Sequence, residues 1–302
     1  MANEFEDKVA IITGAGNGLG FCHASYLAGR GAKVLVNDLG GGTLGLEAQG
    51  IDGGTAERAA EKIRAEGGQA ISNHDSVCEA SAAQGMVDQA LQEWGRLDIL
   101  INNAGIASAQ FFPEVDAEEM QRHFDLTLMG CLHSMKAAWP QMVEQKRGRI
   151  LNTGSAACFG NPIASYASTK AGLWGLTKAV AIFGREHDIN VNLLLPAAFS
   201  RLTDQLPESD FKTRLRDDFG PEKVSPLVGH LVHERCQISG EVFSAGAGKF
   251  SRAVYAVTDA APIDLEIKSV EKVMSDVMSA TRLNILGSTH DDMVNLGFPP
   301  EE

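Results

Sequence analysis

The stretch KVAIITGAGNGLG, residues 8–20, joins a short apolar run to a turn that contains four glycines. The run KVAIIT (8–13) has the length and the β-branched content of a buried strand, and a helical pattern begins at residue 18. Glycines in the turn let the backbone bend sharply and approach a ligand closely. The start of a helix offers free N–H groups and the positive end of its dipole to a pyrophosphate. The stretch therefore predicts a dinucleotide-binding unit, with a tight turn that binds nothing as the alternative.

The rest of the chain alternates strand and helix patterns. Strands are predicted at 8–13, 33–37, 69–73, 97–102, 148–153 and 189–195, with a seventh at 240–248, and helices at 18–30, 54–66, 79–94, 115–145 and 165–185. Because such alternation forms parallel sheets that helices cover on both faces, we expect an α/β fold: a doubly wound, mostly parallel, seven-stranded Rossmann sheet. We assign residues 1–248 to a dinucleotide-binding catalytic domain. Residues 249–302 are expected to form a C-terminal helical extension packed on the same domain or on a partner subunit.

Composition limits the partners of this chain. Of 302 residues 44% are hydrophobic, and the formal net charge of −13 argues against nucleic-acid binding. The first residues lack the apolar segment of a secretion signal, and no apolar run of about 18 residues is present. His230, His233 and Cys236 lack the fourth ligand and the spacing of a zinc site. We therefore expect a cytoplasmic protein with no membrane partner and no metal.

Acidic residues follow the second and third predicted strands. Asp38 can accept hydrogen bonds from the hydroxyls of an adenosine ribose and would repel a 2′-phosphate, and residues 12–20 and 38–40 contain no Arg or Lys. This favours NAD over NADP, with a simple turn cap as the alternative reading of Asp38. Asp75, in NHDSV (73–77), is expected near the adenine, with a helix N-cap as its alternative.

Tyr166 and Lys170, in YASTK, are spaced to face the same side of a helix. An isolated tyrosine has a pKa of about 10, so an acid–base role at neutral pH needs a nearby ammonium to stabilise the phenolate. Lys170 can supply that charge and hold a ribose, and small neighbouring residues admit a cofactor. Ser155 ends the fifth strand and NNAG (102–105) ends the fourth, and ligands of parallel sheets bind at the carboxyl ends of strands. Ser155 can donate a hydrogen bond to a substrate carbonyl.

Together, TGAGNGLG, NNAG, Ser155 and YASTK resemble the short-chain dehydrogenase/reductase family over residues 7–248. The resemblance implies hydride transfer between a nicotinamide cofactor and an alcohol or ketone. It also implies that Tyr166 is the acid/base, Lys170 its activator and Ser155 the residue that orients the substrate. The cofactor contacts that we expect are Gly14, Asn17, Gly18, Leu19, Gly20, Asp38, Asp75, Ser76, Val77, Asn103, Ala104, Gly105, Tyr166, Lys170, Pro196 and Phe199.

Three departures from the family pattern affect the expected site. Thr127 stands where the family has an asparagine of the proton relay. The segment from Ser155 to Tyr166 is about two residues shorter than is usual in the family. Phe199 follows the sixth strand where a glycine is common, and its ring could narrow the nicotinamide pocket.

A narrower resemblance concerns the substrate. VNDLGG with its glycine-rich continuation, GGQAISNHDSV, AAWPQM and GEVFSAGAG are similar to the (3R)-hydroxyacyl-CoA dehydrogenase part of peroxisomal type-2 multifunctional enzymes and their bacterial single-domain relatives. This implies a 3-hydroxyacyl-CoA substrate with a fatty-acyl or steroid side chain, and a homodimer or homotetramer. A dehydrogenase of free hydroxysteroids or other secondary alcohols and a non-catalytic NAD-sensing module are the alternatives.

Overall fold

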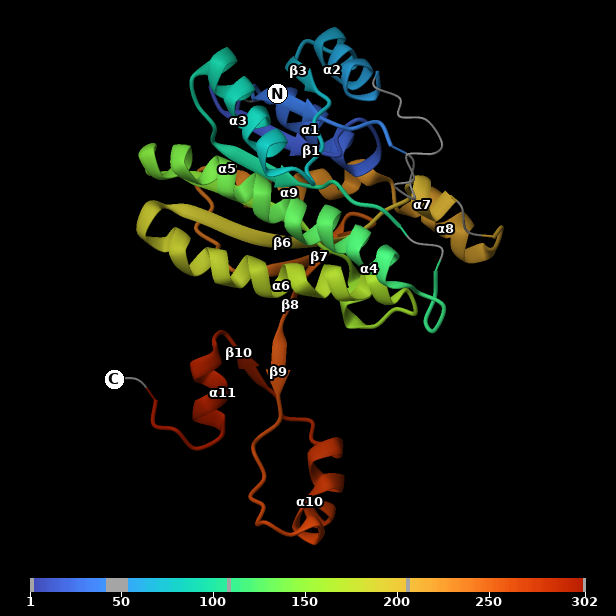
Figure 1. The fold of residues 1–302 in the computed structure, drawn as a ribbon, viewed down its shortest axis with the longest axis vertical. Coiled ribbons are helices and arrows are strands. Elements are labelled where there is room, and N and C mark those ends of the chain that lie inside the picture. The colour runs from blue at the N-terminus through green and yellow to red at the C-terminus, as the bar shows by residue number, and fades with distance from the viewer. Residues whose placement is uncertain (1–2, 42–53, 108–109, 205–206, 301–302) are drawn as a thin grey trace. The chain divides into compact units, whose positions relative to one another are not determined.

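The computed structural model describes residues 3–41, 54–107, 110–204 and 207–300 (Figure 1). The chain forms two compact units, Met1–Arg252 and Ala253–Glu302. The predicted cofactor contacts all lie within the described part of the first unit.

The first unit is built on one sheet in the order β3-β2-β1-β4-β5-β6-β7-β8. Its strands are β1 (Val9–Thr13), β2 (Lys33–Asn37), β3 (Gln69–Asn73), β4 (Ile99–Asn102), β5 (Gly148–Thr153), β6 (Ile189–Ala197), β7 (Val242–Gly246) and β8 (Lys249–Ala253). The pairs from β3 to β7 are parallel. Since β1 pairs with both β2 and β4, the strand order reverses there, and a doubly wound sheet opens a crevice at that point. The Rossmann fold predicted from the sequence is confirmed.

The sheet has eight strands, so the predicted count of seven is wrong by one. The turn between β7 and β8 consists of Ala247 and Gly248, whose φ angles of 50° and 70° are both positive. Such a two-residue turn reverses the chain into an antiparallel hairpin. The side chains of β8 are mostly exposed, so this edge strand has no apolar pattern that sequence analysis could detect.

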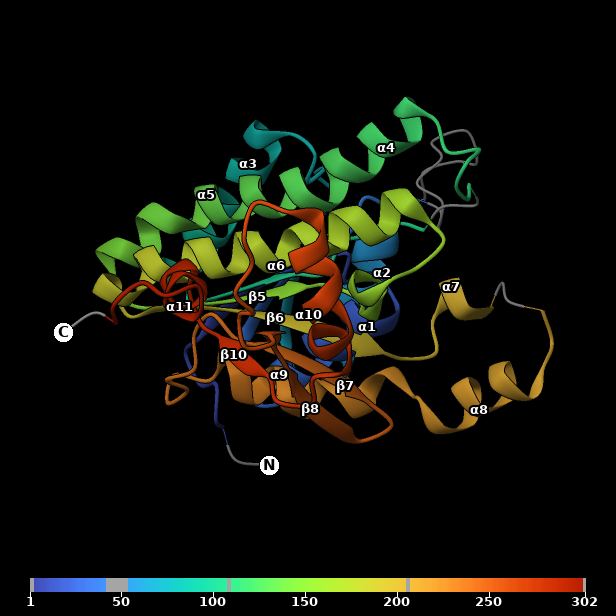
Figure 2. The same cartoon turned by 90° about the horizontal axis from the view of Figure 1, so that it is seen from below.

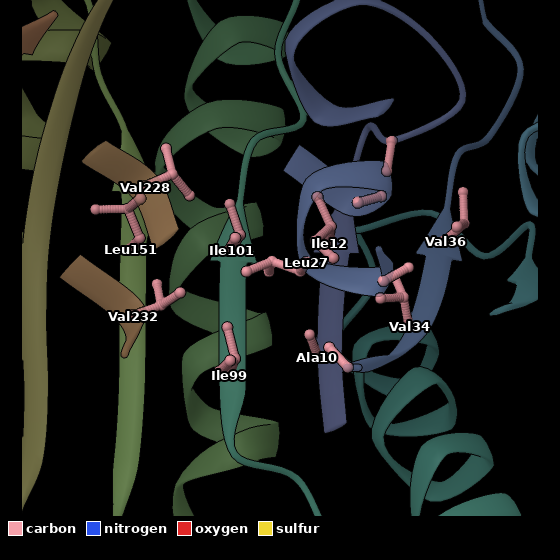
Figure 3. Close-up of a cluster of buried hydrophobic side chains, with 14 of the residues drawn as sticks. Ala10, Ile12, Leu27, Val34, Val36, Ile99, Ile101, Leu151, Val228 and Val232 are labelled. Carbon is pink, nitrogen blue, oxygen red and sulfur yellow. The ribbon is translucent and has the colours of Figure 1, made fainter. Parts of the chain in front are cut away.

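Helices cover both faces of the sheet (Figure 2). One face carries α1 (Gly18–Ala28), α2 (Thr55–Ala65) and α9 (Ser225–Val232), and the other carries α3 (Ala80–Trp94), α5 (Gly130–Glu144) and α6 (Ala164–Gly184). Figure 3 shows the core on the first face, where Leu27 of α1 and Val228 and Val232 of α9 pack on Ile12, Ile99, Ile101 and Leu151. Burial of apolar side chains holds these helices on the sheet. The carboxyl ends of the strands are where a ligand of such a sheet binds.

The helix predicted at 115–145 is confirmed as one uninterrupted helical run from Ala117 to Glu144, but not all of it is α-helix. It consists of α4 (Ala117–His123), the π-helix η2 (Phe124–Met129) and α5. An α-helix has backbone hydrogen bonds between residues four apart, and a π-helix between residues five apart. Apolar periodicity does not distinguish the two, so sequence analysis did not detect the π-helix. Single π-helical turns inside α-helices are frequent at functional sites.

Short elements that were not predicted connect the strands of the first unit. After β5 and α6 come η3 (Ala156–Phe159) and η4 (Arg185–His187), and after β6 come α7 (Arg201–Asp204), α8 (Asp210–Asp218) and η5 (Pro221–Val224). These segments lie outside the regular strand–helix alternation, and η3 begins directly after Ser155.

The second unit contains two short antiparallel strands, β9 (Tyr255–Val257) and β10 (Asn284–Leu286), with α10 (Ile267–Ser279) and α11 (Thr289–Asn295). None of its described side chains is buried. Apolar residues of α10, among them Val270, Val273 and Val277, line an open hollow together with Val257 and Ile263. How this unit docks stays a prediction. In the part of the chain that the structure describes, no helix has the length and apolarity needed to cross a membrane.

Candidate active site

The glycine turn is held against the end of β4. Thr13 Oγ1 accepts hydrogen bonds from the backbone N–H groups of Asn103 (3.0 Å) and Ala104 (3.1 Å). The Asn103 amide donates to the carbonyl oxygens of Thr13 and Gly14, at 3.1 and 2.9 Å. A Cβ atom on Gly14 would lie 2.7 Å from Ala104 Cα, so only glycine fits there. The strand ends at 13–14 and 102–105 are therefore locked together at the crevice.

The start of α1 has the form expected for phosphate binding. Gly18 has φ +54°, and a Cβ atom on it would meet no other atom within 4 Å. A Cβ atom on Gly20 would lie 2.4 Å from the carbonyl oxygen of Gly14. The Asn17 side chain precedes α1 without capping it, and Leu19 packs against the core. The turn thus presents backbone rather than side chains to the crevice.

Asp38 is held at the end of β2 by two backbone donors. Its Oδ2 accepts from Gly16 N and its Oδ1 from Gly40 N, each at 2.8 Å. A Cβ atom on Gly16 would lie 2.4 Å from Thr55 Cγ2, so α2 begins beside the same turn. Arg58 on α2 donates to Thr55 Oγ1 at 3.3 Å. The structure therefore places Arg58 beside Thr55, the residue that borders the glycine turn, which the sequence analysis did not consider.

Asp75 belongs to a polar network at the ends of β2 and β3. Its Oδ2 accepts from Asn73 Nδ2 at 2.9 Å, and its carbonyl oxygen accepts from Asn37 Nδ2 at 2.8 Å. The N-cap residue of α3 is Glu79, so the alternative reading of Asp75 as a helix cap is wrong. The reason is that residues 74–78 form a loop before the helix begins.

Ser76 and Val77 lie in that loop. Ser76 Oγ accepts from Cys78 N at 3.3 Å. Val77 is buried, and a Cβ atom on Gly130 would lie 2.9 Å from Val77 Cγ2. The loop after β3 is therefore packed against the start of α5.

Lys170 is buried beneath the crevice with only 3% of its surface exposed. Its Nζ donates to the carbonyl oxygen of Thr153 at 2.7 Å, and it lies 5.7 Å from the centroid of the Tyr166 ring. A Cβ atom on Gly105 would lie 3.5 Å from the same Nζ. A buried ammonium is costly without further polar partners, and ribose hydroxyls beside Gly105 and Lys170 would supply them. The end of β5, the end of β4 and α6 thus meet around one cation.

Ser155 caps the short helix η3, and its Oγ accepts from Ala157 N at 3.2 Å. Its side chain is partly exposed, as is that of Tyr166. Pro196 lies in β6. Phe199 follows that strand, its N–H donates to the carbonyl oxygen of Phe219 at 2.7 Å, and its ring lies 5.4 Å from the Arg216 guanidinium carbon.

Thr127 lies inside the π-helix η2 and is 1% exposed. Its Oγ1 has no hydrogen-bond partner among the described residues. Buried hydroxyls usually bond to protein or to ordered water. The hydroxyl of this residue, which stands where the family has an asparagine, therefore has the capacity to hold a water molecule.

Besides Arg58, sequence reasoning missed a histidine at this site. His123, at the end of α4, packs its ring against the ring of Tyr166. Glu119 lies one helical turn before it, and the spacing of the two residues was visible in the sequence. What the sequence did not show is that the helix 117–123 faces α6.

Trp174 is 1% exposed and contacts the Phe159 ring edge-on at 6.1 Å, so it belongs to the core. Phe111 and Phe112, in contrast, are exposed.

The chain matches the family model for short chain dehydrogenases over residues 8–210. It is 43% identical over 251 residues to a peroxisomal hydratase-dehydrogenase-epimerase of Saccharomyces cerevisiae, which covers 82% of this chain and 27% of the yeast protein. It is 35% identical over 261 residues to a protein of Mycobacterium tuberculosis named as a short-chain type dehydrogenase/reductase, covering 86% of this chain and 89% of that one.

A solved structure is also similar. The full-length peroxisomal multifunctional enzyme type 2 of Drosophila melanogaster superposes with a TM-score of 0.79 at 26% identity, over 97% of this chain and 49% of that one. The chain therefore spans about a quarter of the yeast protein and about half of the Drosophila protein.

The fold and the crevice define an oxidoreductase that uses a nicotinamide cofactor. The chain belongs to the short-chain dehydrogenase family.

Proposed function

We propose that the protein is an NAD-dependent dehydrogenase that converts a 3-hydroxyacyl-CoA to the 3-ketoacyl-CoA. The observation that carries the reaction is the meeting of Lys170, Tyr166 and the strand ends at 102–105 and 153–155 around one crevice. The substrate class is supported by the resemblance of VNDLGG, AAWPQM and GEVFSAGAG to the dehydrogenase part of type-2 multifunctional enzymes. The similarity to the Drosophila enzyme of that name points the same way.

The residues of the crevice fit a dinucleotide. The glycine turn leaves room for a pyrophosphate that side chains would fill, and Asp38 offers a carboxylate to a ribose. When bound, NAD⁺ would accept the hydride from the carbon that carries the substrate hydroxyl. Asp38 supports NAD over NADP because a carboxylate attracts ribose hydroxyls and repels a 2′-phosphate.

The protein groups would handle the proton. In the proposed reaction the Tyr166 phenolate takes the proton of the substrate hydroxyl, and Lys170 stabilises the phenolate with its positive charge. Ser155 Oγ orients the substrate oxygen by a hydrogen bond. Hydride and proton then both leave the alcohol, and a ketone is formed.

Apolar surface near the crevice supports a substrate with an apolar part. Phe111, Phe112 and Phe159 are 50%, 75% and 64% exposed. Phe112 N donates to the carbonyl oxygen of Pro162, in the loop that leads to Tyr166. Exposed phenylalanines at 111–112 and at the end of η3 provide surface that an acyl chain or a steroid ring can cover.

The test is turnover with a series of alcohols. Purified protein would be mixed with NAD⁺ and short- and long-chain 3-hydroxyacyl-CoA esters, or with free hydroxysteroids, while NADH absorbance is followed. A higher kcat/KM for the CoA esters than for the free hydroxysteroids supports the proposal. A higher kcat/KM for the free hydroxysteroids would show that the proposed substrate class is wrong. NADH binding with no turnover of any alcohol would favour the sensing module. The expected homo-oligomer and the cytoplasmic location remain predictions. Light scattering would test the first and cell fractionation the second.

A further inference from the structure

His123 lies beside the residue proposed as the acid/base. Its side chain is fully buried, and its imidazole centroid is 6.2 Å from the centroid of the Tyr166 ring. The two ring planes meet at 84°. This edge-to-face geometry is one of the arrangements that aromatic pairs prefer.

Glu119 lies against the imidazole on the same helix, and Arg122 pairs with Glu119. Nε2 of His123 lies 3.2 Å from Oε1 of Glu119, whose side chain is 7% exposed. The other carboxylate oxygen, Oε2, accepts from Arg122 Nε at 3.0 Å. Asp116 Oδ1 accepts from the Glu119 N–H at 2.8 Å and so fixes the first turn of α4. Arg122, Glu119, His123 and Tyr166 form one connected series that joins α4 to α6.

The carboxylate beside His123 is paired with a cation. The Arg122 guanidinium compensates the buried Glu119 carboxylate. Burial lowers the pKa of His123, although Glu119 opposes this. The contact of His123 with Tyr166 is that of the two rings. The cation that lies near the Tyr166 phenol is Lys170, whose Nζ is 5.7 Å from the ring centroid.

We propose that His123 is a positioning residue that holds the Tyr166 ring in the orientation required for catalysis, with Glu119 fixing the imidazole. A tyrosine side chain turns about two bonds, and rotation about the first of them, Cα–Cβ, moves its hydroxyl by ångströms. Because Tyr166 is only partly buried, packing on one side decides how often the hydroxyl lies beside the Lys170 ammonium. A misplacement of about 1 Å can cost about 10²-fold in rate. This inference rests on the proposed acid–base role of Tyr166.

The experiment compares His123→Ala, which removes the ring, with His123→Phe, which keeps an aromatic ring but no titratable group. His23→Ala is the matched control, because His23 is also fully buried but lies between α1 and α9, with Nδ1 2.9 Å from Ser225 Oγ. For each variant the NADH Kd, kcat, the pH–rate profile and Tm would be measured on the best substrate of the wild type.

We expect His123→Ala to lower kcat about tenfold or more with little change in the NADH Kd. Its acidic limb should move to higher pH, because the phenol spends less time beside the ammonium. His123→Phe should restore kcat to within about threefold of wild type. His23→Ala should lower Tm without moving the pH limb. Glu119→Ala should also lower kcat, but by less than His123→Ala does.

The inference is overturned if His123→Ala folds, binds NADH and keeps both kcat and the pH profile. It is also overturned if His123→Phe loses as much activity as His123→Ala, because the ring contact would then not be what matters. If His123→Ala fails to fold, His123→Phe decides: a kcat close to that of the wild type supports the inference, and a large loss of kcat overturns it. Tyr166→Phe separates the two proposals: full activity of that variant would refute the role of Tyr166 itself, whatever the His123 variants do.

Discussion

Replacing Asp38 by Asn should move the cofactor preference from NAD⁺ toward NADP⁺. Asp38 lies at the end of β2, 9% exposed, and its two oxygens accept from Gly16 N and Gly40 N. Asparagine has the same shape but carries no charge, and its single carbonyl oxygen can accept from only one of these two donors. The substitution therefore removes the charge together with one local hydrogen bond, and the ratio of the two cofactors isolates the effect of the charge.

The magnitude follows from the charges. A carboxylate about 4 Å from a 2′-phosphate, at an effective dielectric constant of about 20, repels one unit of its negative charge by about 4 kcal/mol. A factor of ten corresponds to about 1.4 kcal/mol, so the wild type should prefer NAD⁺ by about 10³-fold. Asp38→Asn should reduce that preference by about 10²- to 10³-fold. Binding of NAD⁺ should also weaken by about tenfold, since charge-assisted hydrogen bonds to the ribose are lost.

Arg58 makes a second variant informative. Through Thr55 it lies near the same turn as Asp38, and a guanidinium is suited to bind a phosphate. Part of the gain in NADP⁺ use by Asp38→Asn should therefore disappear in the double variant Asp38→Asn with Arg58→Ala.

The assay is kcat/KM for NAD⁺ and NADP⁺ on one substrate, together with NADH and NADPH binding by fluorescence, which needs no substrate. Asp75→Asn is the matched control, because Asp75 is predicted to lie near the adenine, which both cofactors share, and its substitution should leave their ratio unchanged. Equal use of both cofactors by the wild type would refute the assignment of Asp38 to the ribose. So would an unchanged ratio in Asp38→Asn.

Three further outcomes follow from the structure. Tyr166→Phe should keep NADH binding and lose about 10²-fold or more in kcat, while Lys170→Met should lower both turnover and cofactor affinity; near-full turnover of Tyr166→Phe would disprove its role. Deleting residues 253–302, which bury no described side chain within their own unit, should lower stability or shift substrate preference; an unchanged Tm, oligomer size and substrate profile would show a passive tail. Burial lowers the pKa of His23 to about 3, so below pH 6.5 the unfolded chain binds a proton that the folded chain does not. Stability should therefore fall by up to about 1.4 kcal/mol per pH unit between about pH 6.5 and 3; His23→Gln should have a flatter profile in urea unfolding, and equal slopes would contradict this.

The sequence predicted the sheet because its signals are local. Short apolar runs set β1, β2 and β3 to within a residue, and the glycines at 14–20 required a strand–turn–helix unit. The spacing of Tyr166 and Lys170 was also a local property of one helix. The family and the class of reaction followed from these motifs.

Tertiary structure decided the rest. The exposed strand β8 and the π-helix η2 have no distinctive apolar period, so backbone hydrogen bonding alone reveals them. Arg58 near the glycine turn and the ring of His123 against Tyr166 depend on how α2 meets that turn and how α4 meets α6. Periodicity and turn chemistry are set by neighbouring residues, whereas such contacts join segments far apart in the chain, and only packing of the whole core brings them together.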